Sequence, residues 1–448
     1  MDIKQIQNVF FIGIGGIGMS ALARYFQFIG KNVVGYDKTA STLTSDLILA
    51  GIKIHFEDSI ALIPKDFYIE NTLVIITPAV PISHSQWQFF LERDFIIKKR
   101  AEVLGIITNN TFSFGVAGTH GKTTTTAILG HILFQSGIDV TAFVGGIVEG
   151  YNSNLIGNGK TVTVVEADEF DRSFLHLHPN IACITSTDAD HLDIYGDAKS
   201  IEASFDEFAN KVPDKSNLFI AKGIHIQGQT TGISDGSNYE VINKKISNGV
   251  YVFDVKTPTE SITDITFALP GNHNLHNALM AIAMAKKYGI SNQKIIQALA
   301  SFKGIKRRFS YQIKTDSKIY IDDYAHHPTE INAVYQAVRE LYPSDKVLAI
   351  FQPHLFSRTQ DFASDFAKSL SQFDDVILLD IYPARELPIE GVTSSWLLDK
   401  IENSNKKLVL KQNLLTEVKN TKNKIIVTIG AGDIGEMVID IKKTLLDL

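Results

Sequence analysis

Short apolar runs alternate with amphipathic segments of helical period along most of the 448-residue chain. Runs of this length, rich in β-branched and aromatic residues, predict buried strands, and the helical segments between them predict strand–helix–strand units with parallel sheets. The expected strands lie at residues 8–12, 31–36, 72–76, 112–116, 161–165, 181–185, 319–321, 347–351, 375–379 and 425–429. The pattern therefore predicts an α/β protein.

Changes in this pattern divide the chain into three expected domains, a number that its length also allows. We predict a Rossmann-like domain at residues 1–103, a central P-loop ATPase-like domain with a parallel sheet at 104–304, and a second Rossmann-like domain at 305–448. Within the central domain, residues 213–270 hold short alternating runs separated by Gly, Asn, Asp and Ser. This texture predicts a small, mostly antiparallel insertion.

Composition and charge narrow the class of protein. Hydrophobic residues make up 44% of the chain and charged residues 21%, as in a soluble globular protein. The net charge of −6 gives no reason to expect nucleic acid or an anionic membrane as a partner. The single cysteine, Cys183, lies in an apolar run and predicts a reduced core residue. Because the sequence shows neither a secretory signal nor a long apolar span, we expect a cytoplasmic protein. Its sequence leaves a monomer and a homodimer as open alternatives.

A glycine- and threonine-rich stretch follows the fourth expected strand and leads directly into a helical pattern. A strand, a glycine turn and a helix N-terminus together present backbone N–H groups to a phosphate chain. A lysine and a hydroxyl in such a loop bind the outer phosphates and magnesium. The stretch consists of Gly118, Thr119, His120, Gly121, Lys122, Thr123 and Thr124. It predicts a variant ATP-binding loop, because Val116 stands where the strict motif has glycine.

A second glycine-rich loop follows the first expected strand. It consists of Gly13, Ile14, Gly15, Gly16, Ile17 and Gly18, and Asp37 ends the next strand. Small residues let the backbone approach a diphosphate, and the following helix N-terminus favours its negative charge. The loop predicts a diphosphate site, for which NAD, FAD and a UDP-sugar all qualify. A packing role for the glycines is the alternative.

Polar side chains end two further strands of the central domain. Glu166 and Asp168 follow one strand, and His191 follows the next. The carboxyl ends of parallel strands share one edge, so these groups should lie near the ATP phosphates, where magnesium needs few protein oxygens. A helix cap or a solvated loop is the alternative for Asp168. Asn274 and Asn277 open a later helix, and they either cap it or bind a base edge.

The last third of the chain places basic and aromatic side chains at strand ends in the same way. Arg308 lies at the second domain boundary, where it is either solvated or reaches a transferring phosphate. A substrate site is expected from the side chains that follow two strands, namely Tyr324, His326, His354 and Arg358. The glycine motif at 430–435 indicates tight packing of a strand on a helix rather than a second nucleotide site.

The combination of these sites predicts a class of enzyme. A diphosphate site, an ATP and magnesium site, and a basic cleft fit an enzyme that uses ATP to join a nucleotide-linked substrate to a small acid or amine. The sequence lacks a serine elbow, a metal-type set of Cys and His, and a redox cysteine pair. A motor ATPase would not need the outer domains, and a dehydrogenase would not need the ATP loop.

Eight motifs then carry a family resemblance. They lie at residues 13–19, 118–124, 166–169, 190–193, 273–274, 307–308, 322–330 and 351–354. With these motifs the chain resembles the Mur ligases, and within them the alanine-adding branch, over nearly its whole length. The resemblance implies a two-step synthesis of a peptidoglycan precursor. The carboxylate of UDP-N-acetylmuramate would attack the γ-phosphate of ATP to give an acyl phosphate and ADP. The amine of L-alanine would then displace phosphate.

The resemblance also implies a role for each candidate residue. Catalytic roles would fall to Lys122, His191, Arg308 and His326. One magnesium ion would be held by Thr123 and Glu166, and a second by His191. ATP would also contact the loop Gly118, Thr119, His120, Gly121, Lys122, Thr123 and Thr124, together with Asn274, Asn277 and Arg308. The UDP diphosphate would bind at Gly13, Gly15, Gly16, Ile17 and Gly18, with Asp37 towards the nucleoside. L-Alanine would bind at Tyr324, His326, His354 and Arg358.

Two positions depart from the family pattern. Several Mur ligases carry a carbamylated lysine where this chain has Phe205, which favours the alanine-adding branch. The family's arginine after Phe-Gln-Pro-His is Leu355 here, so Arg358 would bind the amino acid's carboxylate alone. The nearest alternative is the related ligase that attaches a recycled tripeptide to the same nucleotide. A non-catalytic nucleotide-binding regulator is a more distant one.

Overall fold

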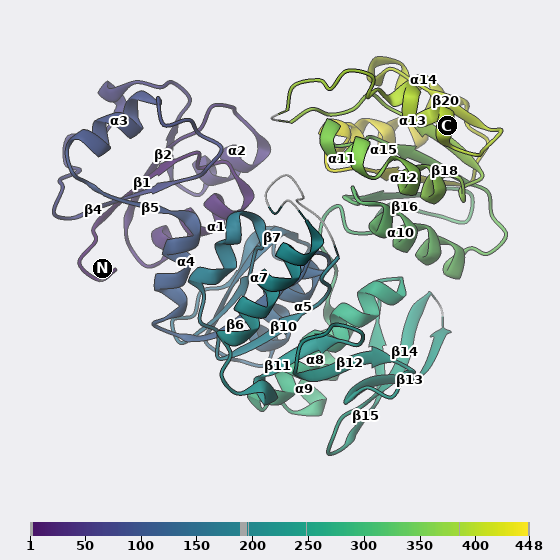
Figure 1. Ribbon diagram of the computed structural model, residues 1–448, viewed down its shortest axis with the longest axis horizontal. Helices are drawn as coiled ribbons and strands as arrows, with labels where there is room; N and C mark the ends of the chain where they lie inside the picture. The colour runs from purple at the N-terminus through teal and green to yellow at the C-terminus, as the bar shows by residue number, and fades with distance from the viewer. Residues whose placement is uncertain (1–2, 189–194, 196, 248, 385, 447–448) are drawn as a thin grey trace. The chain divides into compact units, whose positions relative to one another are not determined.

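The structure is a computed structural model that describes residues 3–188, 195, 197–247, 249–384 and 386–446. It is an α/β protein with three sheets, which confirms the fold class expected from the sequence (Figure 1). The chain divides into two compact units. The first comprises Met1–Lys244, Val252–Thr266 and His276–Lys303, and the second comprises Lys245–Tyr251, Phe267–Leu275 and Gly304–Leu448.

The first sheet consists of parallel strands in the order β3-β2-β1-β4-β5. The strands are β1 (Asn8–Ile12), β2 (Asn32–Tyr36), β3 (Lys53–His55), β4 (Thr72–Ile76) and β5 (Ile96–Lys99). The helices are α1 (Ile17–Phe28), α2 (Thr42–Leu49), α3 (Ser85–Glu92) and α4 (Arg100–Thr108). Successive strand residues point to opposite faces. Phe11 accordingly packs with Leu22 and Val103, whereas Phe10 packs with Phe90. Both faces are therefore covered, as a parallel sheet requires.

The second sheet has the order β15-β14-β13-β12-β11-β10-β6-β9-β7-β8. Its strands are β6 (Phe112–Ala117), β7 (Val140–Val148), β8 (Ser153–Gly157), β9 (Val162–Glu166), β10 (Ile181–Ile184), β11 (Leu218–Ala221), β12 (Gln229–Ile233), β13 (Tyr239–Ser247), β14 (Val250–Lys256) and β15 (Ser261–Phe267). Strands β10, β6, β9 and β7 are parallel neighbours, whereas β8 pairs antiparallel with β7. The carboxyl ends of β6, β9 and β10 therefore share one edge.

The strands over residues 218–241 differ in direction from the antiparallel insertion expected there. β11 pairs in parallel with β10, β12 with β11, and β13 with β12. These strands extend the central sheet. The alternating runs indicated strands correctly. The direction of a strand, however, depends on the path of the connection before it, here residues 222–228 and 234–238, and periodicity does not report that path.

Helix α5 (Lys122–Gln135), which follows the expected ATP loop, is fixed in the interior. Its residues from Thr123 to Leu133 are all buried. His131 anchors it further, since its Nε2 lies 3.0 Å from the carbonyl oxygen of Ala298. The other elements of the region are the 3-10 helix η2 (Phe170–His176) and helices α7 (Ala198–Asn210), α8 (Asn272–Tyr288) and α9 (Asn292–Ser301). Over the described ranges, every helix is too short or too polar to cross a membrane.

The third sheet has the order β16-β17-β21-β18-β19-β20, in which only the β16–β17 pair is antiparallel. The strands are β16 (Ser310–Lys314), β17 (Ile319–Asp323), β18 (Val347–Phe351), β19 (Asp375–Leu378), β20 (Lys406–Leu408) and β21 (Ile425–Ile429). The helices are α10 (Pro328–Leu341), α11 (Phe356–Asp361), α12 (Ala363–Leu370), α13 (Ser394–Lys400), α14 (Leu414–Asn420) and α15 (Val438–Leu446). Ile321 packs in one core with α10 and α12, and Tyr320 packs in the other with α14 and α15. The strands therefore present their polar carboxyl ends between two apolar layers.

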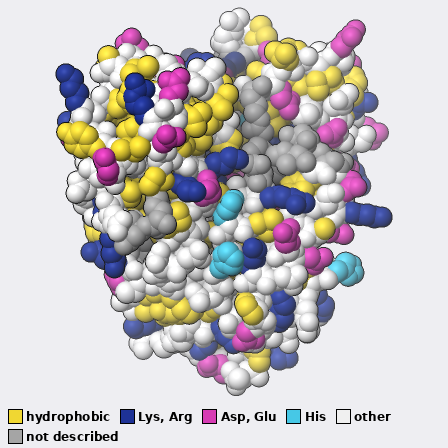
Figure 2. All heavy atoms as spheres, turned by 60° about the vertical axis from the view of Figure 1, so that its left-hand side comes forward, with side chains coloured by type: hydrophobic (Ala, Val, Ile, Leu, Met, Phe, Trp, Pro, Cys, Tyr) yellow, Lys and Arg dark blue, Asp and Glu magenta, His cyan; other side chains and the backbone are white. Residues whose placement is uncertain are grey.

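Charges of both signs are interspersed on the face that Figure 2 shows. The sequence holds 43 Lys and Arg residues and 49 Asp and Glu residues, so the two signs nearly balance. Charge alone therefore points to no particular surface of the protein, and the site has to be located from the strand ends.

Candidate active site

The expected ATP loop connects β6 to α5 at the carboxyl edge of the central sheet. Gly118 has φ +131°, and a Cβ there would lie 2.1 Å from Oγ1 of Thr185. Gly121 has φ +85°, and its Cβ would lie 2.4 Å from Oδ1 of Asn277. Both positions require glycine, because another residue would be strained and would collide with its neighbour. The tight turn leads into the N-terminus of α5, where a phosphate chain is favoured.

Two loop residues tie this turn to the segment after β10. Oγ1 of Thr119 donates to the carbonyl oxygen of Asp188 at 2.7 Å, and the backbone N–H of His120 donates to Oγ of Ser186 at 2.8 Å. The imidazole of His120 lies 3.5 Å from the Asp188 carboxylate. Thr124 is buried below the loop. These contacts hold the turn in place, so that its backbone is preorganised for a phosphate.

Lys122 makes an ion pair that the sequence analysis did not anticipate. Its Nζ donates to both carboxylate oxygens of Glu169, at 2.8 and 2.7 Å, and to the carbonyl oxygen of Gly118 at 2.6 Å. The side chains of Lys122 and Glu169 are only 15% and 4% exposed. The sequence analysis included Glu169 only as the last residue of the motif at 166–169. Its position three residues after Glu166 was the one sequence signal that placed it near the ATP loop.

The ion pair changes the titration of both groups. Burial raises the pKa of the Glu169 carboxyl to about 7, against the opposing attraction of Lys122. Burial acts to lower the pKa of Lys122, but the attraction of Glu169 and Asp168 outweighs it and raises that pKa. Lys122 is therefore charged at neutral pH, whereas the Glu169 carboxyl titrates near neutral pH.

Thr123 and Glu166 lie side by side at the same edge. Oγ1 of Thr123 donates to Oε2 of Glu166 at 3.2 Å, and the backbone N–H of Gly145 donates to Oε1. One hydroxyl and one carboxylate fit magnesium, which completes its shell with phosphate oxygens and water. Within the described part of the chain, larger clusters of metal-binding side chains are absent. His191, the third candidate, lies outside the described residues.

The N-terminal glycine loop connects β1 to α1. The carboxylate of Asp37 accepts hydrogen bonds from the backbone N–H groups of Gly15, at 2.6 Å, and Thr39, at 3.1 Å. Gly16 caps α1 without a side-chain hydrogen bond, and the first turn of the helix has no acidic residue. The helix N-terminus therefore keeps its positive field, while Asp37 occupies one N–H group of the loop.

A pocket of about 320 Å³ connects this glycine loop to Glu166. We call it the donor pocket. It is lined by Gly16, Ile17, Gly18, Met19, Ala21, Thr77, Arg100, Leu104, Phe143, Val144, Gly145, Glu166 and Asp168. The fold thus brings two stretches that are far apart in the sequence into the lining of one pocket. Arg100 lines the pocket as well, and the sequence analysis gave it no role.

The two asparagines at the start of α8 are both buried. Nδ2 of Asn274 donates to the carbonyl oxygen of Pro270 at 2.7 Å, so the side chain stabilises the first turn of the helix. The side chain of Asn277 lies against Gly121 of the ATP loop. Contact of either residue with adenine stays a prediction.

In the second unit, three of the expected amino-acid ligands gather at the carboxyl ends of β17 and β18. The ring centroids of Tyr324 and His326 are 5.4 Å apart, and those of His326 and His354 are 6.2 Å apart. The guanidinium of Arg308 lies 5.4 Å from the Tyr324 ring centroid. Arg358 lies in α11, a few residues beyond His354, and is buried. A basic, aromatic cluster of this kind suits a small zwitterion.

Glu330 connects the histidine and the arginine of this cluster. Its Oε2 accepts a hydrogen bond from the backbone N–H of His326 at 2.9 Å and lies 3.3 Å from the ring Nδ1. Its Oε1 lies 4.0 Å from Nη1 of Arg308. Glu330 is the third residue of α10 and belongs to a capping box. That capping pattern was a sequence signal for its position, although the sequence analysis did not include Glu330 among the site residues.

Two aspartates hold the segment that carries Arg308. Asp323 accepts hydrogen bonds from the backbone N–H groups of Phe309, at 2.7 Å, and Ala325, at 2.8 Å. Asp322 pairs with Arg307 at 3.1 Å. Arg307 and Phe309 both have positive φ, 63° and 48°, a conformation that needs support in residues other than glycine. The aspartates supply this support.

Replacing Asp323 by alanine should therefore destabilise the second unit by roughly 2–4 kcal/mol, because two buried N–H groups lose their acceptor. The chain has two tryptophans, and Trp396 lies in the second unit. Urea unfolding followed by fluorescence in a Trp87→Phe background reports on Trp396 alone. Asp316→Ala removes the same charge from an exposed position and is the control. Equal midpoints for the two variants would contradict the role given to Asp323.

The two departures from the family pattern occupy defined positions. Phe205 is fully buried and packs edge-on against Phe174, at a centroid distance of 5.6 Å. Leu355 precedes α11, is nearly buried and has φ +72°, which is unusual for a bulky residue. Position 205 therefore serves core packing, and position 355 shapes the turn between His354 and Arg358.

The glycine motif at 430–435 packs against neighbouring side chains, as the sequence analysis indicated. A Cβ at Gly432 would lie 2.3 Å from Oε1 of Gln352, and one at Gly435 would lie 2.3 Å from Nη1 of Arg307. Added side chains would displace these neighbours. The motif thus lets β21 and the short helix η5 (Asp433–Met437) approach the end of β18 closely.

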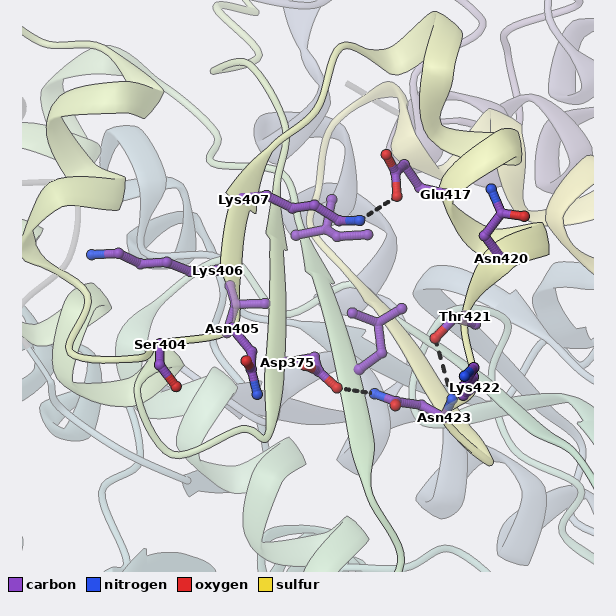
Figure 3. A pocket seen from close by; sticks show the side chains of 13 residues that line it. Asp375, Ser404, Asn405, Lys406, Lys407, Glu417, Asn420, Thr421, Lys422 and Asn423 are labelled. Carbon is purple, nitrogen blue, oxygen red and sulfur yellow. Dashed lines mark hydrogen bonds and ion pairs between the residues drawn. The ribbon is translucent and has the colours of Figure 1, made fainter.

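A separate pocket of about 370 Å³ opens at the opposite edge of the third sheet, where β18, β19 and β20 begin (Figure 3). Lys407 forms an ion pair with Glu417 there, and Nδ2 of Asn423 donates to Asp375 at 2.6 Å. The residues that line it all differ from the candidates of the sequence analysis. This pocket therefore contains none of the site residues predicted from the sequence.

Comparison with known proteins defines the class. Three models of Mur ligase domains match the chain: the family's catalytic domain at residues 8–111, its middle domain at 116–285, and its glutamate ligase domain at 307–433. A UDP-N-acetylmuramate–L-alanine ligase of Flavobacterium psychrophilum is 71% identical over 445 residues, which are 99% of each chain. The chain belongs to the Mur ligase family.

Other relatives agree with this assignment. A UDP-N-acetylmuramate–L-alanine ligase of Cytophaga hutchinsonii is 44% identical and covers 99% of this chain and 97% of its own. A solved UDP-N-acetylmuramate–alanine ligase of Thermotoga maritima has a TM-score of 0.81 at 26% identity and covers 98% of each chain. A murein peptide ligase of Psychrobacter arcticus has a TM-score of 0.69 at 22% identity over 99% of each chain, which shows a shared fold alone. Mur ligases are ATP-dependent enzymes, so this chain is an ATP-dependent ligase.

Proposed function

We propose that this Mur ligase uses ATP to join L-alanine to the carboxylate of UDP-N-acetylmuramate, a step in the synthesis of peptidoglycan precursors. The observation that carries the proposal is the donor pocket, which runs from the glycine loop to Glu166. A nucleotide-linked acid fits such a pocket, with its diphosphate on the loop and its carboxylate towards the ATP loop. The high identity to ligases of this name supports the choice of substrates.

The residues of the chain can supply what the reaction needs. A carboxylate becomes a good acyl donor once one of its oxygens carries a phosphoryl group, and this transfer needs mainly positioning and charge neutralisation. Lys122 would donate to the phosphate oxygens, and Thr123 and Glu166 would hold magnesium. When bound, magnesium neutralises charge on the transferring group.

We propose that the second unit receives the amino acid. Tyr324, His354 and Arg358 would bind L-alanine, and His326 would accept a proton from its ammonium group, since only the neutral amine is a nucleophile. Glu330 would orient His326, because it contacts both the backbone N–H and the ring of that residue.

Release of phosphate from ATP tests the proposal. We expect release by the full-length chain to require magnesium, UDP-N-acetylmuramate and L-alanine together. Release that depends on a tripeptide and ignores L-alanine would favour the recycling ligase instead. Binding of both nucleotides without any turnover would favour a regulatory protein.

The ion pair of Lys122 with Glu169 predicts that ATP binding takes up a proton. Phosphates at Lys122 place negative charge beside Glu169, so its pKa should rise above the value of about 7 that it has without them. A carboxyl whose pKa rises on binding takes up a proton, so ATP affinity should fall as the pH rises above 7. The decrease approaches about tenfold for each unit of pKa shift.

Calorimetry with a non-hydrolysable ATP analogue, in buffers of different ionisation enthalpy, measures this uptake. Glu169→Gln should remove it and flatten the pH dependence of the affinity. Glu207→Gln, which makes the same change at an exposed position of α7, should leave both as they are. Equal proton uptake in the wild type and in Glu169→Gln would show that another group titrates.

A further inference from the structure

Arg100 places a positive charge in the donor pocket. It is the first residue of α4, and its side chain is 25% exposed. The helix behind it is held in the core by Val103, Leu104 and Ile107. The backbone that carries this guanidinium is therefore fixed, and its charge remains within reach of whatever occupies the pocket.

Gly18 determines how closely the guanidinium approaches the glycine loop. A Cβ at this position would lie 2.9 Å from Cδ, 3.1 Å from Nη1 and 3.2 Å from Nε of Arg100. A side chain there would displace the arginine. Because Gly18 is the second residue of α1, the guanidinium lies at the N-terminus of that helix, which also attracts anions. The charge of the Arg100 guanidinium and the positive end of the α1 dipole therefore act together at the end of the glycine loop.

Building on the function proposed above, we propose that Arg100 binds an anionic group of the nucleotide-linked acid. That group is either the diphosphate on the glycine loop or the carboxylate that points to Glu166. Both present paired oxygens, and the planar guanidinium donates well to such pairs. Arg100 is thus a substrate-binding residue in addition to the loop itself.

Asp168 competes with the ligand for Arg100. Its Oδ2 accepts a hydrogen bond from Nη2 of Arg100 at 3.2 Å, and its side chain is 35% exposed. An anion that binds the guanidinium has to replace this partner or share it, and it also meets the negative charge of Asp168. Loss of Arg100 should therefore weaken binding of the acid, whereas loss of the Asp168 charge should strengthen it. A merely structural ion pair would give the same sign for both changes.

The test measures binding of UDP-N-acetylmuramate to the full chain by calorimetry. Arg100→Ala should raise its Kd about 10- to 100-fold, the loss expected for hydrogen bonds to a charged group, and Arg100→Lys should restore part of it. Asp168→Asn should lower the Kd by about two- to fivefold, as for a partly exposed ion pair. The KM for ATP should stay constant in the two Arg100 variants.

Arg93→Ala is the matched control. Arg93 lies in the same N-terminal region, stacks over the Phe89 ring at 4.0 Å and does not line the donor pocket. Its removal makes the same change of charge and should leave the Kd unchanged. Thermal unfolding of each variant checks that the fold is intact, and Arg100→Lys and Asp168→Asn carry the test if Arg100→Ala does not fold.

UDP and UDP-N-acetylglucosamine, which lack the carboxylate, distinguish the two anions. If Arg100→Ala weakens all three ligands, Arg100 binds the diphosphate. If it weakens only UDP-N-acetylmuramate, Arg100 binds the carboxylate. An unchanged Kd in folded Arg100→Ala would overturn the proposal, and so would equal weakening by Asp168→Asn. Failure of the wild type to bind UDP-N-acetylmuramate would instead refute the proposed function.

Discussion

Lys122→Ala should abolish ligation, with kcat lowered about 10³-fold or more, because the loop loses the charge that stabilises the transferring phosphoryl group. The Kd of UDP-N-acetylmuramate should change by no more than about twofold, since the glycine loop that is expected to bind its diphosphate is a separate element. Phosphate release measures the first quantity, and calorimetry measures the second. Lys160→Ala, which removes an exposed lysine, is the control.

The partner of Lys122 has to be considered in this experiment. Without the lysine, Glu169 is buried without its cation, and its pKa should rise further above about 7. A carboxyl with a raised pKa in the folded state binds protons more tightly there, so the variant should lose stability as the pH rises from 5 to 8. The double variant Lys122→Met with Glu169→Gln buries no unpaired charge. Inactivity of this folded double variant would show that the catalytic loss comes from the missing ammonium group. Substantial activity in it would contradict the role of Lys122.

The buried parallel strands of the three sheets could be predicted because they depend on periodicity, whereas the direction of the strands over residues 218–241 could not. Runs such as 72–76 and 425–429 form fully buried parallel strands. The glycine turns at 13–18 and 118–121 were predictable as well, since each connects a buried strand to a helix. Because parallel strands share their carboxyl edge, the meeting of Thr123 with Glu166 followed from the fold class. Local pattern and topology together therefore predicted the framework of the site.

The partners of the charged groups could not be predicted in the same way. Glu169 contacts Lys122 because the chain turns between the end of β9 and the start of η2. From the sequence alone, the neighbouring Asp168 was an equally good candidate partner for Lys122. Arg100 belongs to the N-terminal region, yet its side chain pairs with Asp168 beyond β9. Such pairs depend on side-chain reach across elements, which no spacing along the chain encodes.

Glu166→Gln should lower kcat by about 10²- to 10³-fold, since it removes the charged ligand of the proposed magnesium site. Glu166 accepts from Thr123 on one oxygen and from the backbone N–H of Gly145 on the other, so the glutamine keeps an acceptor for one of these two donors. Thermal unfolding of the variant checks that the remaining loss comes from charge and not from a disturbed fold. The concentration of magnesium needed for half-maximal activity should rise. UDP-N-acetylmuramate should bind as tightly as before or more tightly, because Glu166 lines the donor pocket and its negative charge opposes an acid there.

A magnesium titration of phosphate release, with calorimetry of the acid alongside it, separates these effects. Glu207→Gln makes the same chemical change at an exposed position of α7 and should match the wild type in both measurements. A charge that acts only on the acid would change the Kd of UDP-N-acetylmuramate and leave the magnesium requirement constant. Loss of a magnesium ligand would raise the magnesium requirement whether or not the Kd of the acid falls, because the metal is attracted to the carboxylate. An unchanged magnesium requirement together with near-normal kcat would therefore remove Glu166 from the metal site and leave Thr123 as its only described ligand.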